Sequence, residues 1–231
     1  MKFLCLHGSG TNSSILQSQT GPLRHELGEG HEYEFVEAII RCAPAQGVEA
    51  LSSPGHEYYA FFDPANLATL QTAIDQLDGY VSSEGPFDAV LGFSSGCVVA
   101  AMYLLQKQQQ SRSSALPFKC AIFLSCAEVR KEMKYLGVDG AAGSFIRVPT
   151  AHIWGSKDST APSGGQDLSD ICDPETRLMV THDGGHDMPR GSYLTEACHV
   201  IRRILQLAKK AQSGGSRIAA SNSRKGSTMM G

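Results

Sequence analysis

Short apolar runs bounded by Gly, Pro, Asp or Ser recur along the chain, and runs of this length are typical of buried strands. Six of them stand at residues 3–6, 33–37, 87–91, 120–125, 150–154 and 177–181. Helical periodicity of apolar positions separates several of these runs, at residues 13–27, 66–81, 95–109 and 193–211. Because strands and helices alternate, the pattern predicts an α/β fold with a mostly parallel, doubly wound sheet flanked by helices.

Two segments do not fit this alternation. Residues 42–64 combine aromatic side chains with the breakers Pro44, Pro54 and Gly55. This favours either a loop that covers a substrate or a surface loop held by its own aromatic rings. Residues 212–231, rich in Ser, Gly, Lys and Arg, are predicted to form a disordered tail after a single domain at residues 1–211.

Composition narrows the class of protein. The net charge of −3 gives no general attraction to nucleic acid or to an anionic membrane, so neither is expected as a partner. No apolar run reaches the length of about 18 residues that a membrane span needs, and the apolar N-terminus is too short for a signal peptide. Seven scattered cysteines without a C-x-x-C pair indicate a reducing, cytoplasmic location, with no metal and no cofactor expected.

Residues 92–96, Gly-Phe-Ser-Ser-Gly, join a predicted strand to a predicted helix. Glycines on both sides of a serine at such a junction are typical of a nucleophile elbow, where the strained turn exposes the hydroxyl. The pentapeptide is a weak signal by itself, because a chain with 24 glycines contains it by chance in about one case in four. Whether Ser94 is a nucleophile therefore depends on its partners.

In this class of fold the acid and then the histidine follow the serine along the chain. His186 stands on a glycine-rich loop between the last strand and the last helix, and His182, at the end of that strand, is the alternative. Asp158 comes just after the strand at residues 150–154 and is the expected acid. Its other interpretation is a carboxylate that caps a turn or a helix.

An acyl-transfer site also needs donors for the negative oxygen that forms during attack. The backbone N–H of Ser95, which follows the serine, is one candidate. The second is the N–H of Ser9, in the loop after the first strand, where Gly8 lets the backbone turn. His7 precedes Ser94 in the chain and is expected to be structural. The same loop lacks the G-K-[ST] of a phosphate-binding loop.

Several segments together resemble the FSH family of serine hydrolases, α/β-hydrolases that are widespread in fungi, over about residues 2–207. These segments are LCLHGSGTN, SQTGPLR, DAVLGFSSG, HIWGSKD and GGHDMP. The resemblance implies the α/β-hydrolase fold and a catalytic triad of Ser94, Asp158 and His186. Members of the family more often carry Gln and Ala where this chain has Ser95 and Cys97, a departure that leaves the backbone donor and the triad in place.

One branch of this family consists of thioesterases that release the acyl chain from the carrier protein of fungal polyketide synthases, and residues 20–24 resemble that branch. The resemblance implies a hydrolase that cleaves an acyl thioester or ester through an acyl-enzyme. The alternatives are a carboxylesterase for short or medium acyl esters, an acyltransferase with the same triad, or a binding protein that kept the fold. An acidic carrier would meet Arg130, Lys131 and Lys134, which otherwise form a solvated helix face.

Overall fold

The computed structural model describes residues 1–51, 55–110, 116–138 and 146–225. In this part of the chain six parallel strands form one sheet, in the order β2-β1-β5-β6-β7-β8. They are β1 (Lys2–Leu6), β2 (Glu32–Val36), β5 (Ala89–Phe93), β6 (Cys120–Leu124), β7 (Thr150–Gly155) and β8 (Arg177–His182). The predicted parallel sheet is confirmed, and β5 runs further toward the serine than the apolar pattern indicates.

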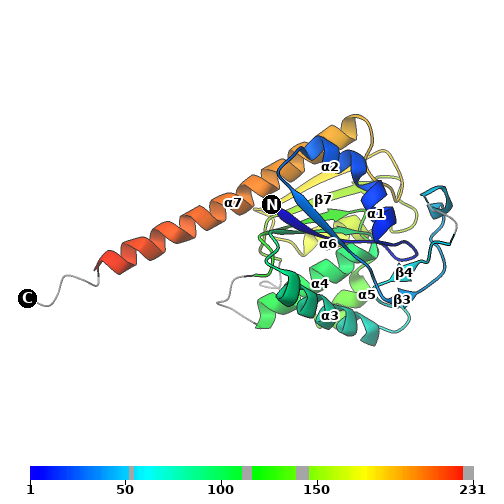
Figure 1. Cartoon of the computed structure of the whole chain (residues 1–231), viewed down its shortest axis with the longest axis horizontal. Coiled ribbons are helices and arrows are strands. Elements are labelled where there is room, and N and C mark those ends of the chain that lie inside the picture. Colours follow the sequence, from blue (N-terminus) through cyan, green and yellow to red (C-terminus); the bar gives the residue numbers. More distant parts are fainter. Residues whose placement is uncertain (52–54, 111–115, 139–145, 226–231) are drawn as a thin grey trace, which may run out of the picture.

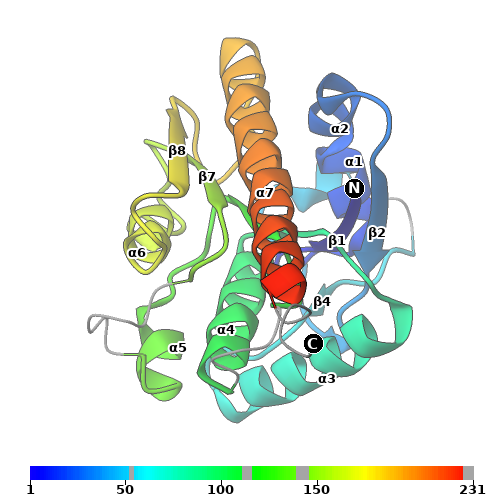
Figure 2. The ribbon, with the colours of Figure 1, turned by 90° about the vertical axis from the view of Figure 1, so that its left-hand side faces the viewer.

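Helices cover both faces of this sheet (Figures 1 and 2). One face carries α1 (Ser13–Gln19), α2 (Gly21–Leu27) and α7 (Ser192–Lys225), and the other carries α3 (Ala68–Glu84), α4 (Ser95–Gln110), α5 (Arg130–Tyr135) and α6 (Gly164–Asp170). Successive side chains of a strand point to opposite faces. Phe3 and Cys5 therefore enter the core under α7, while Leu4 and Leu6 enter the core under α4. Strands buried on both faces read as continuous apolar runs.

The helix predicted at residues 13–27 is in fact two helices. The chain breaks at Thr20, between α1 and α2. Pro22 has no N–H to donate and its ring excludes a continuous helix through this point. Thr20 Oγ1 donates to the carbonyl oxygen of Leu16 at 2.8 Å and so satisfies the end of α1. The break lets α2 turn toward α7.

Residues 42–64 contain more regular structure than the sequence indicates. Strands β3 (Ile40–Arg41) and β4 (Tyr59–Ala60) pair antiparallel, and a short 3₁₀ helix, η1 (Val48–Leu51), lies between them. The segment also bonds to the loop after β1: Gly10 N donates to Tyr59 O at 3.0 Å, and Ala45 N donates to Gly10 O at 2.9 Å. Residues 52–54 lie outside the described part of the chain.

Helix α7 continues to Lys225, and its distal part extends away from the sheet (Figure 1). The backbone is thus helical into the segment 212–231 for which the composition predicts disorder, while residues 226–231 lie outside the described part. The division into a domain at residues 1–211 and a disordered tail stays a prediction. Within the described residues, no helix combines the length and the apolar character needed to cross a lipid bilayer.

Candidate active site

Ser94 occupies the sharp turn between β5 and α4. Its φ of 53° lies in the left-handed region, a conformation that costs a residue other than glycine about 1–3 kcal/mol. The glycines beside it let three elements approach closely. A Cβ on Gly92 would stand 2.6 Å from Cys97 N, and one on Gly96 would stand 2.2 Å from Leu6 O. The predicted elbow therefore has a steric basis on both sides of the serine.

His186 and Asp158 meet Ser94 in one chain of hydrogen-bonding atoms. His186 Nε2 lies 2.8 Å from Ser94 Oγ, and His186 Nδ1 lies 2.7 Å from Asp158 Oδ2. A carboxylate only accepts hydrogen bonds, so Nδ1 carries the imidazole proton and Nε2 faces the serine hydroxyl with its lone pair. This is the arrangement in which an imidazole takes a proton from a serine.

Asp158 makes the contacts that both of its predicted roles require, one set with each oxygen. Oδ2 contacts His186, while Oδ1 accepts from the backbone N–H groups of Thr160 at 2.9 Å and Ala161 at 2.8 Å. Its side chain is only 3% exposed. Three hydrogen bonds in a buried setting fix the orientation of the carboxylate, and through it the orientation of the imidazole.

The loops that carry the acid and the base are packed directly on each other. A Cβ on Gly155 would stand 2.2 Å from the carbonyl oxygens of both Gly184 and Gly185, so only glycine fits there. Lys157 N donates to Gly184 O at 3.0 Å. His182, the alternative base, is buried and does not contact the serine: its Nδ1 accepts from Gly184 N at 3.1 Å. His182 therefore shapes the loop of His186.

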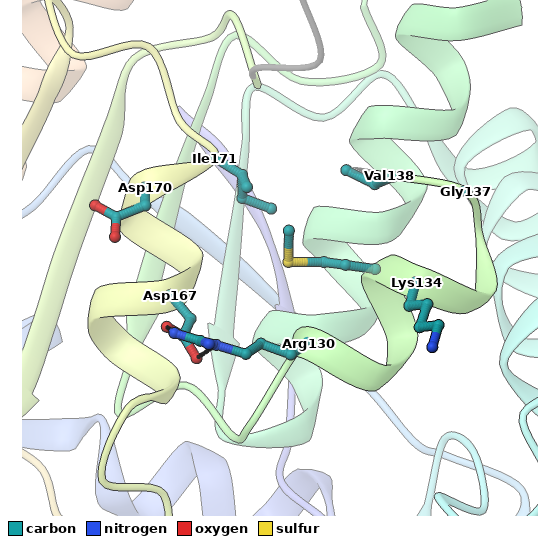
Figure 3. A pocket seen from close by; sticks show the side chains of 8 residues that line it. Arg130, Lys134, Gly137, Val138, Asp167, Asp170 and Ile171 are labelled. Atoms are coloured by element: carbon teal, nitrogen blue, oxygen red, sulfur yellow. Dashed lines mark hydrogen bonds and ion pairs between the residues drawn. The ribbon is translucent and has the colours of Figure 1, made fainter. Parts of the chain in front are cut away.

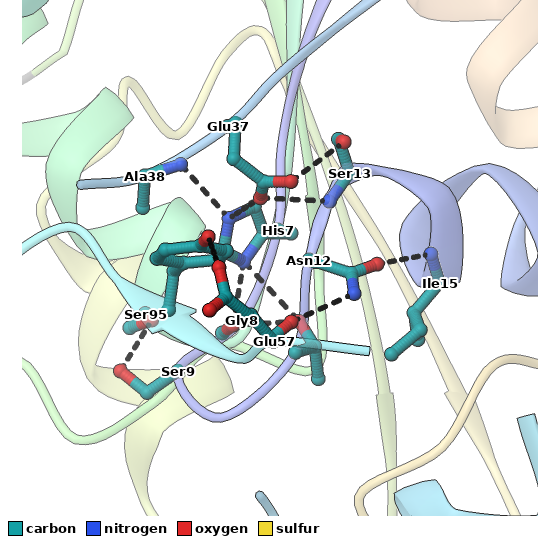
Figure 4. A network of polar contacts seen from close by, with 12 residues as sticks. His7, Gly8, Ser9, Asn12, Ser13, Ile15, Glu37, Ala38, Glu57 and Ser95 are labelled. Atoms are coloured by element: carbon teal, nitrogen blue, oxygen red, sulfur yellow. Dashed lines mark hydrogen bonds and ion pairs between the residues drawn. The ribbon is translucent and has the colours of Figure 1, made fainter. Parts of the chain in front are cut away.

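The loop after β1 lies against Ser94, and Figure 4 shows the polar contacts that hold this loop. A Cβ on Gly8 would stand 3.1 Å from Ser94 Cβ. Gly8 O accepts from Thr11 Oγ1 at 2.7 Å and from His7 Nδ1 at 2.8 Å. In a trans peptide the C=O and the following N–H point in opposite directions. Fixing Gly8 O therefore also fixes the direction of the Ser9 N–H.

His7 holds this peptide as a neutral imidazole. Its Nε2 accepts from Ala38 N at 3.1 Å, which leaves the ring proton on Nδ1 for Gly8 O. Burial lowers the pKa of His7 and favours the same neutral form. Glu37 Oε1 stands 3.0 Å from Nε2 and would accept its proton only after protonation of the ring. The sequence predicts a structural His7, but not this network, whose partners come from distant parts of the chain.

A cavity of about 520 Å³ opens over the serine. Its wall includes Ser9, Ser94 and Ser95, so the structure brings the three predicted serines to one space. Phe62 and Pro64 add an apolar part, which means that residues 42–64 contribute to the wall of the cavity. The other lining residues are Ala127, Glu128, Arg130, Lys131, Glu132, Thr160 and Ala161. Glu132 is the buried acid of this lining, and its burial raises the pKa of its carboxyl group.

Arg130 also borders a second cavity, of about 590 Å³, between α5 and α6 (Figure 3). Its guanidinium donates through Nε and Nη2 to the two carboxylate oxygens of Asp167, both at 2.7 Å. The Asp167 side chain is 7% exposed, and this contact lowers its pKa. Of the three basic residues predicted to meet an acidic partner, Arg130 thus has its charge paired within the chain. Among the described residues, no three metal-ligating side chains gather around a common point.

A parallel sheet between two layers of helices, with a serine elbow and its histidine and aspartate at the carboxyl ends of the strands, defines an α/β-hydrolase. The fold is similar to that of Zea mays acyl-protein thioesterase 2, with a TM-score of 0.64 at 17% identity over 88% of this chain and 93% of that one. The model of the family described as Serine hydrolase (FSH1) matches residues 1–198, and the chain belongs to that family.

Two fungal relatives extend this result. The chain is 40% identical over 200 residues to esterase FPY3 of Fusarium mangiferae, which covers 82% of this chain and 89% of that protein. It is 29% identical over 264 residues to esterase alnB of Emericella nidulans, covering 83% of this chain and 91% of that protein. The chain is therefore a serine hydrolase that acts on esters, and the predicted family, fold and enzyme class are confirmed.

Proposed function

We propose that the enzyme cleaves an acyl thioester or ester through a covalent acyl-enzyme on Ser94. The observation that carries this proposal is the chain of contacts from Asp158 through His186 to Ser94, at 2.7 and 2.8 Å, which ends at a serine on the wall of a cavity. Ser94 is the nucleophile, His186 the general base and Asp158 the residue that orients the imidazole. Ser9 and Ser95 supply the backbone donors of the oxyanion hole.

Each step follows from that geometry. Ser94 Oγ attacks the acyl carbon while its proton passes to His186 Nε2, and the electron pair of the carbonyl bond moves to its oxygen. The N–H groups of Ser9 and Ser95 stabilise this negative oxygen. When the tetrahedral intermediate collapses, the bond to the leaving group breaks and His186 returns the proton to it. A water molecule, activated by the same imidazole, then releases the acid from Ser94.

Replacing the nucleophile tests this proposal. Ser94→Ala is expected to abolish hydrolysis of p-nitrophenyl butyrate and labelling by a fluorophosphonate, because both reactions need the Ser94 hydroxyl. Ser83→Ala, the same change on α3 away from the cavity, is the matched control and should leave both reactions unchanged. Turnover retained in a folded Ser94→Ala variant would show that another residue carries the reaction.

We further propose that the acyl group is of the polyketide type and arrives on the acyl carrier domain of a polyketide synthase. The similarity of residues 20–24 to the polyketide-releasing branch of the family supports this substrate. A thiol has a pKa near 8.5, so a thiolate leaves readily and the oxyanion donors become the main catalytic requirement. Lys131, exposed at the cavity, and Lys134, one turn further along α5, are the basic residues expected to meet the carrier.

The carrier proposal predicts a substrate-dependent effect. Lys131→Glu and Lys134→Glu should lower kcat/KM for a carrier-bound acyl thioester about tenfold at low salt, yet leave a small N-acetylcysteamine thioester unaffected. Lys209→Glu on α7 serves as the charge-matched control. Equal turnover of the carrier-bound substrate by all variants would refute docking at α5. Preference for small oxygen esters would favour the carboxylesterase alternative, and acyl transfer to an added alcohol would favour the acyltransferase.

A further inference from the structure

The side chains of Ser9 and Ser95 form a hydroxyl pair beside the nucleophile. Ser9 Oγ and Ser95 Oγ are 3.1 Å apart and hydrogen-bonded, although 86 positions separate the two residues in sequence (Figure 4). One hydroxyl comes from the loop after β1 and the other from the first residue of α4. Both residues line the cavity that contains Ser94. The pair therefore faces the space in which the substrate reacts.

The two hydroxyls of this pair have one O–H group that their mutual hydrogen bond does not use. Two hydroxyls hold two protons, and their mutual hydrogen bond uses one of them. Among the hydrogen bonds of the described residues, neither hydroxyl has a second partner. Whichever serine donates within the pair, one O–H remains for a group in the cavity. The hydroxyl that accepts within the pair is the better donor, because hydrogen bonds in a chain polarise one another.

The same two residues are also the ones expected to meet the reacting oxygen. Each hydroxyl belongs to a residue whose backbone N–H is assigned to the oxyanion hole, and Gly8, just before Ser9, contacts Ser94. Resting on the proposed function, we propose that the Ser9–Ser95 pair supplies a third, side-chain donor to the substrate's carbonyl oxygen during attack by Ser94. The pair donates a hydrogen bond and transfers no proton. Its contribution grows as the oxygen becomes negative, because hydrogen bonds to charged acceptors are about twice as strong as neutral ones.

The hydroxyls of Ser9 and Ser95, which meet at 3.1 Å, can be removed without removing the backbone N–H groups of the same residues. Alanine at either position removes the hydroxyl and keeps the backbone N–H. Substitution by alanine therefore measures the contribution of the side-chain donor alone. The two backbone donors cannot be removed by changing a side chain.

Kinetics of Ser9→Ala and Ser95→Ala test the inference. Each is expected to lower kcat for p-nitrophenyl butyrate about tenfold with little change in KM, because the lost contact strengthens only in the transition state. Removal of one oxyanion donor costs about 10²- to 10³-fold in other hydrolases, and two backbone donors remain here. The kcat of the double variant should be only slightly below that of the less active single variant, because the two hydroxyls act as a unit.

Inhibitor binding distinguishes a donor from a structural role. The inhibition constant of a trifluoromethyl ketone, which forms a tetrahedral adduct with Ser94, should rise by the same factor as kcat falls. The inhibition constant of butyrate, the product, should stay the same. Ser9→Thr keeps a hydroxyl at this exposed position and should recover most of the kcat that Ser9→Ala loses, while Ser83→Ala controls for loss of a serine elsewhere.

The outcomes separate this inference from the proposed function. Wild-type turnover that Ser94→Ala abolishes establishes the nucleophile. If folded Ser9→Ala and Ser95→Ala then keep wild-type kcat and inhibitor affinity, the third donor is refuted and the hydrolase stands. A parallel rise in the inhibition constants of the ketone and of butyrate also refutes it, because it indicates a distorted cavity. Wild-type protein that shows no turnover and no fluorophosphonate labelling refutes the proposed function itself.

Discussion

Two histidine–carboxylate pairs lie at the carboxyl edge of the sheet, and they differ in which partner is buried. His186 pairs with Asp158 at 2.7 Å, and the acid is 3% exposed while the imidazole is 16% exposed and contacts Ser94 Oγ. His7 stands 3.0 Å from Glu37, but here the imidazole is fully buried and the acid is 43% exposed. The imidazole and the carboxylate thus occupy opposite positions relative to solvent in the two pairs.

The second nitrogen of each ring shows what this difference means. In His186 it faces Ser94 Oγ, a group that can lose a proton. In His7 both nitrogens contact the main chain, at Gly8 O and Ala38 N, so the ring has no reacting partner. A histidine beside a carboxylate is therefore not enough for a general base. Of the two pairs, the one with the buried acid is the one whose second ring nitrogen meets a serine hydroxyl.

The largest expected effect concerns the reacting pair. His186→Ala should lower kcat for p-nitrophenyl butyrate on the order of 10⁵-fold, because among the described residues the side chain that hydrogen-bonds to Ser94 Oγ is that of His186. His182→Ala is the control, since His182 shapes the neighbouring loop without contacting the serine. A loss in His182→Ala as large as in His186→Ala would contradict the assignment of the base.

Asp158→Asn should cost on the order of 10⁴-fold in kcat, because an amide that donates to Nδ1 favours the wrong imidazole tautomer. Glu37→Gln, the same change at the exposed acid, should cost less than about threefold. Steady-state kinetics at neutral pH measure both. Equal losses in the two variants would mean that the two pairs are not functionally distinct.

Two substitutions of His7 test its contact with Gly8 O and its contact with Ala38 N one at a time. His7→Asn places an amide nitrogen near the position of Nδ1 and can still donate to Gly8 O, whereas His7→Gln reaches toward the position of Nε2 and cannot. We expect a kcat loss of about threefold for Asn and about 30-fold for Gln, because only Gln releases the peptide that carries the Ser9 N–H. The reverse order would show that the Ala38 contact matters more.

The smallest effect is a dependence of stability on pH. Burial keeps the folded-state pKa of His7 below its ordinary value, so below about pH 6.5 the unfolded chain binds a proton that the folded chain does not. The free energy of unfolding should fall as pH falls through 6.5, with a slope of up to about 1.4 kcal/mol per pH unit from this residue. His152, whose pKa burial lowers to about 3, adds a slope of the same sign.

Urea unfolding between pH 7.5 and 5, followed by circular dichroism, measures this slope. His7→Asn should show a shallower slope than the wild type, because its side chain does not titrate. Parallel slopes in the two proteins would indicate that His7 has the same proton affinity in the folded and unfolded states, and that burial does not set its neutral form.

Much of this architecture is predictable from sequence because its signals are local. The strands of the sheet are continuous apolar runs, and the order of Ser94, Asp158 and His186 along the chain is a property of the fold class. The hairpin of β3 and β4 was not predictable, since each strand has only two residues and shows no periodicity. The bonds that join this region to the loop after β1 connect residues more than 30 positions apart in sequence.

Pairings between distant residues were also not predictable. Nothing near Arg130 in sequence indicates that its guanidinium pairs with Asp167, which is 37 positions away. Asp158 is a different case, because its place in the sequence predicts a contact with the histidine and a contact with a turn as alternatives. A carboxylate has two oxygens, and here each oxygen makes one of these contacts.

The bonds between Gly10 and residues 42–64 set a limit on engineering this enzyme. A designer who wished to change its substrate range would exchange that segment, because Phe62 and Pro64 line the cavity. A Cβ on Gly10 would stand 2.4 Å from Ala45 N, so the graft would have to reproduce the backbone at Ala45 and at Tyr59. We expect an exchanged segment that lost either contact to lower the rate for the original substrate and for the intended new substrate.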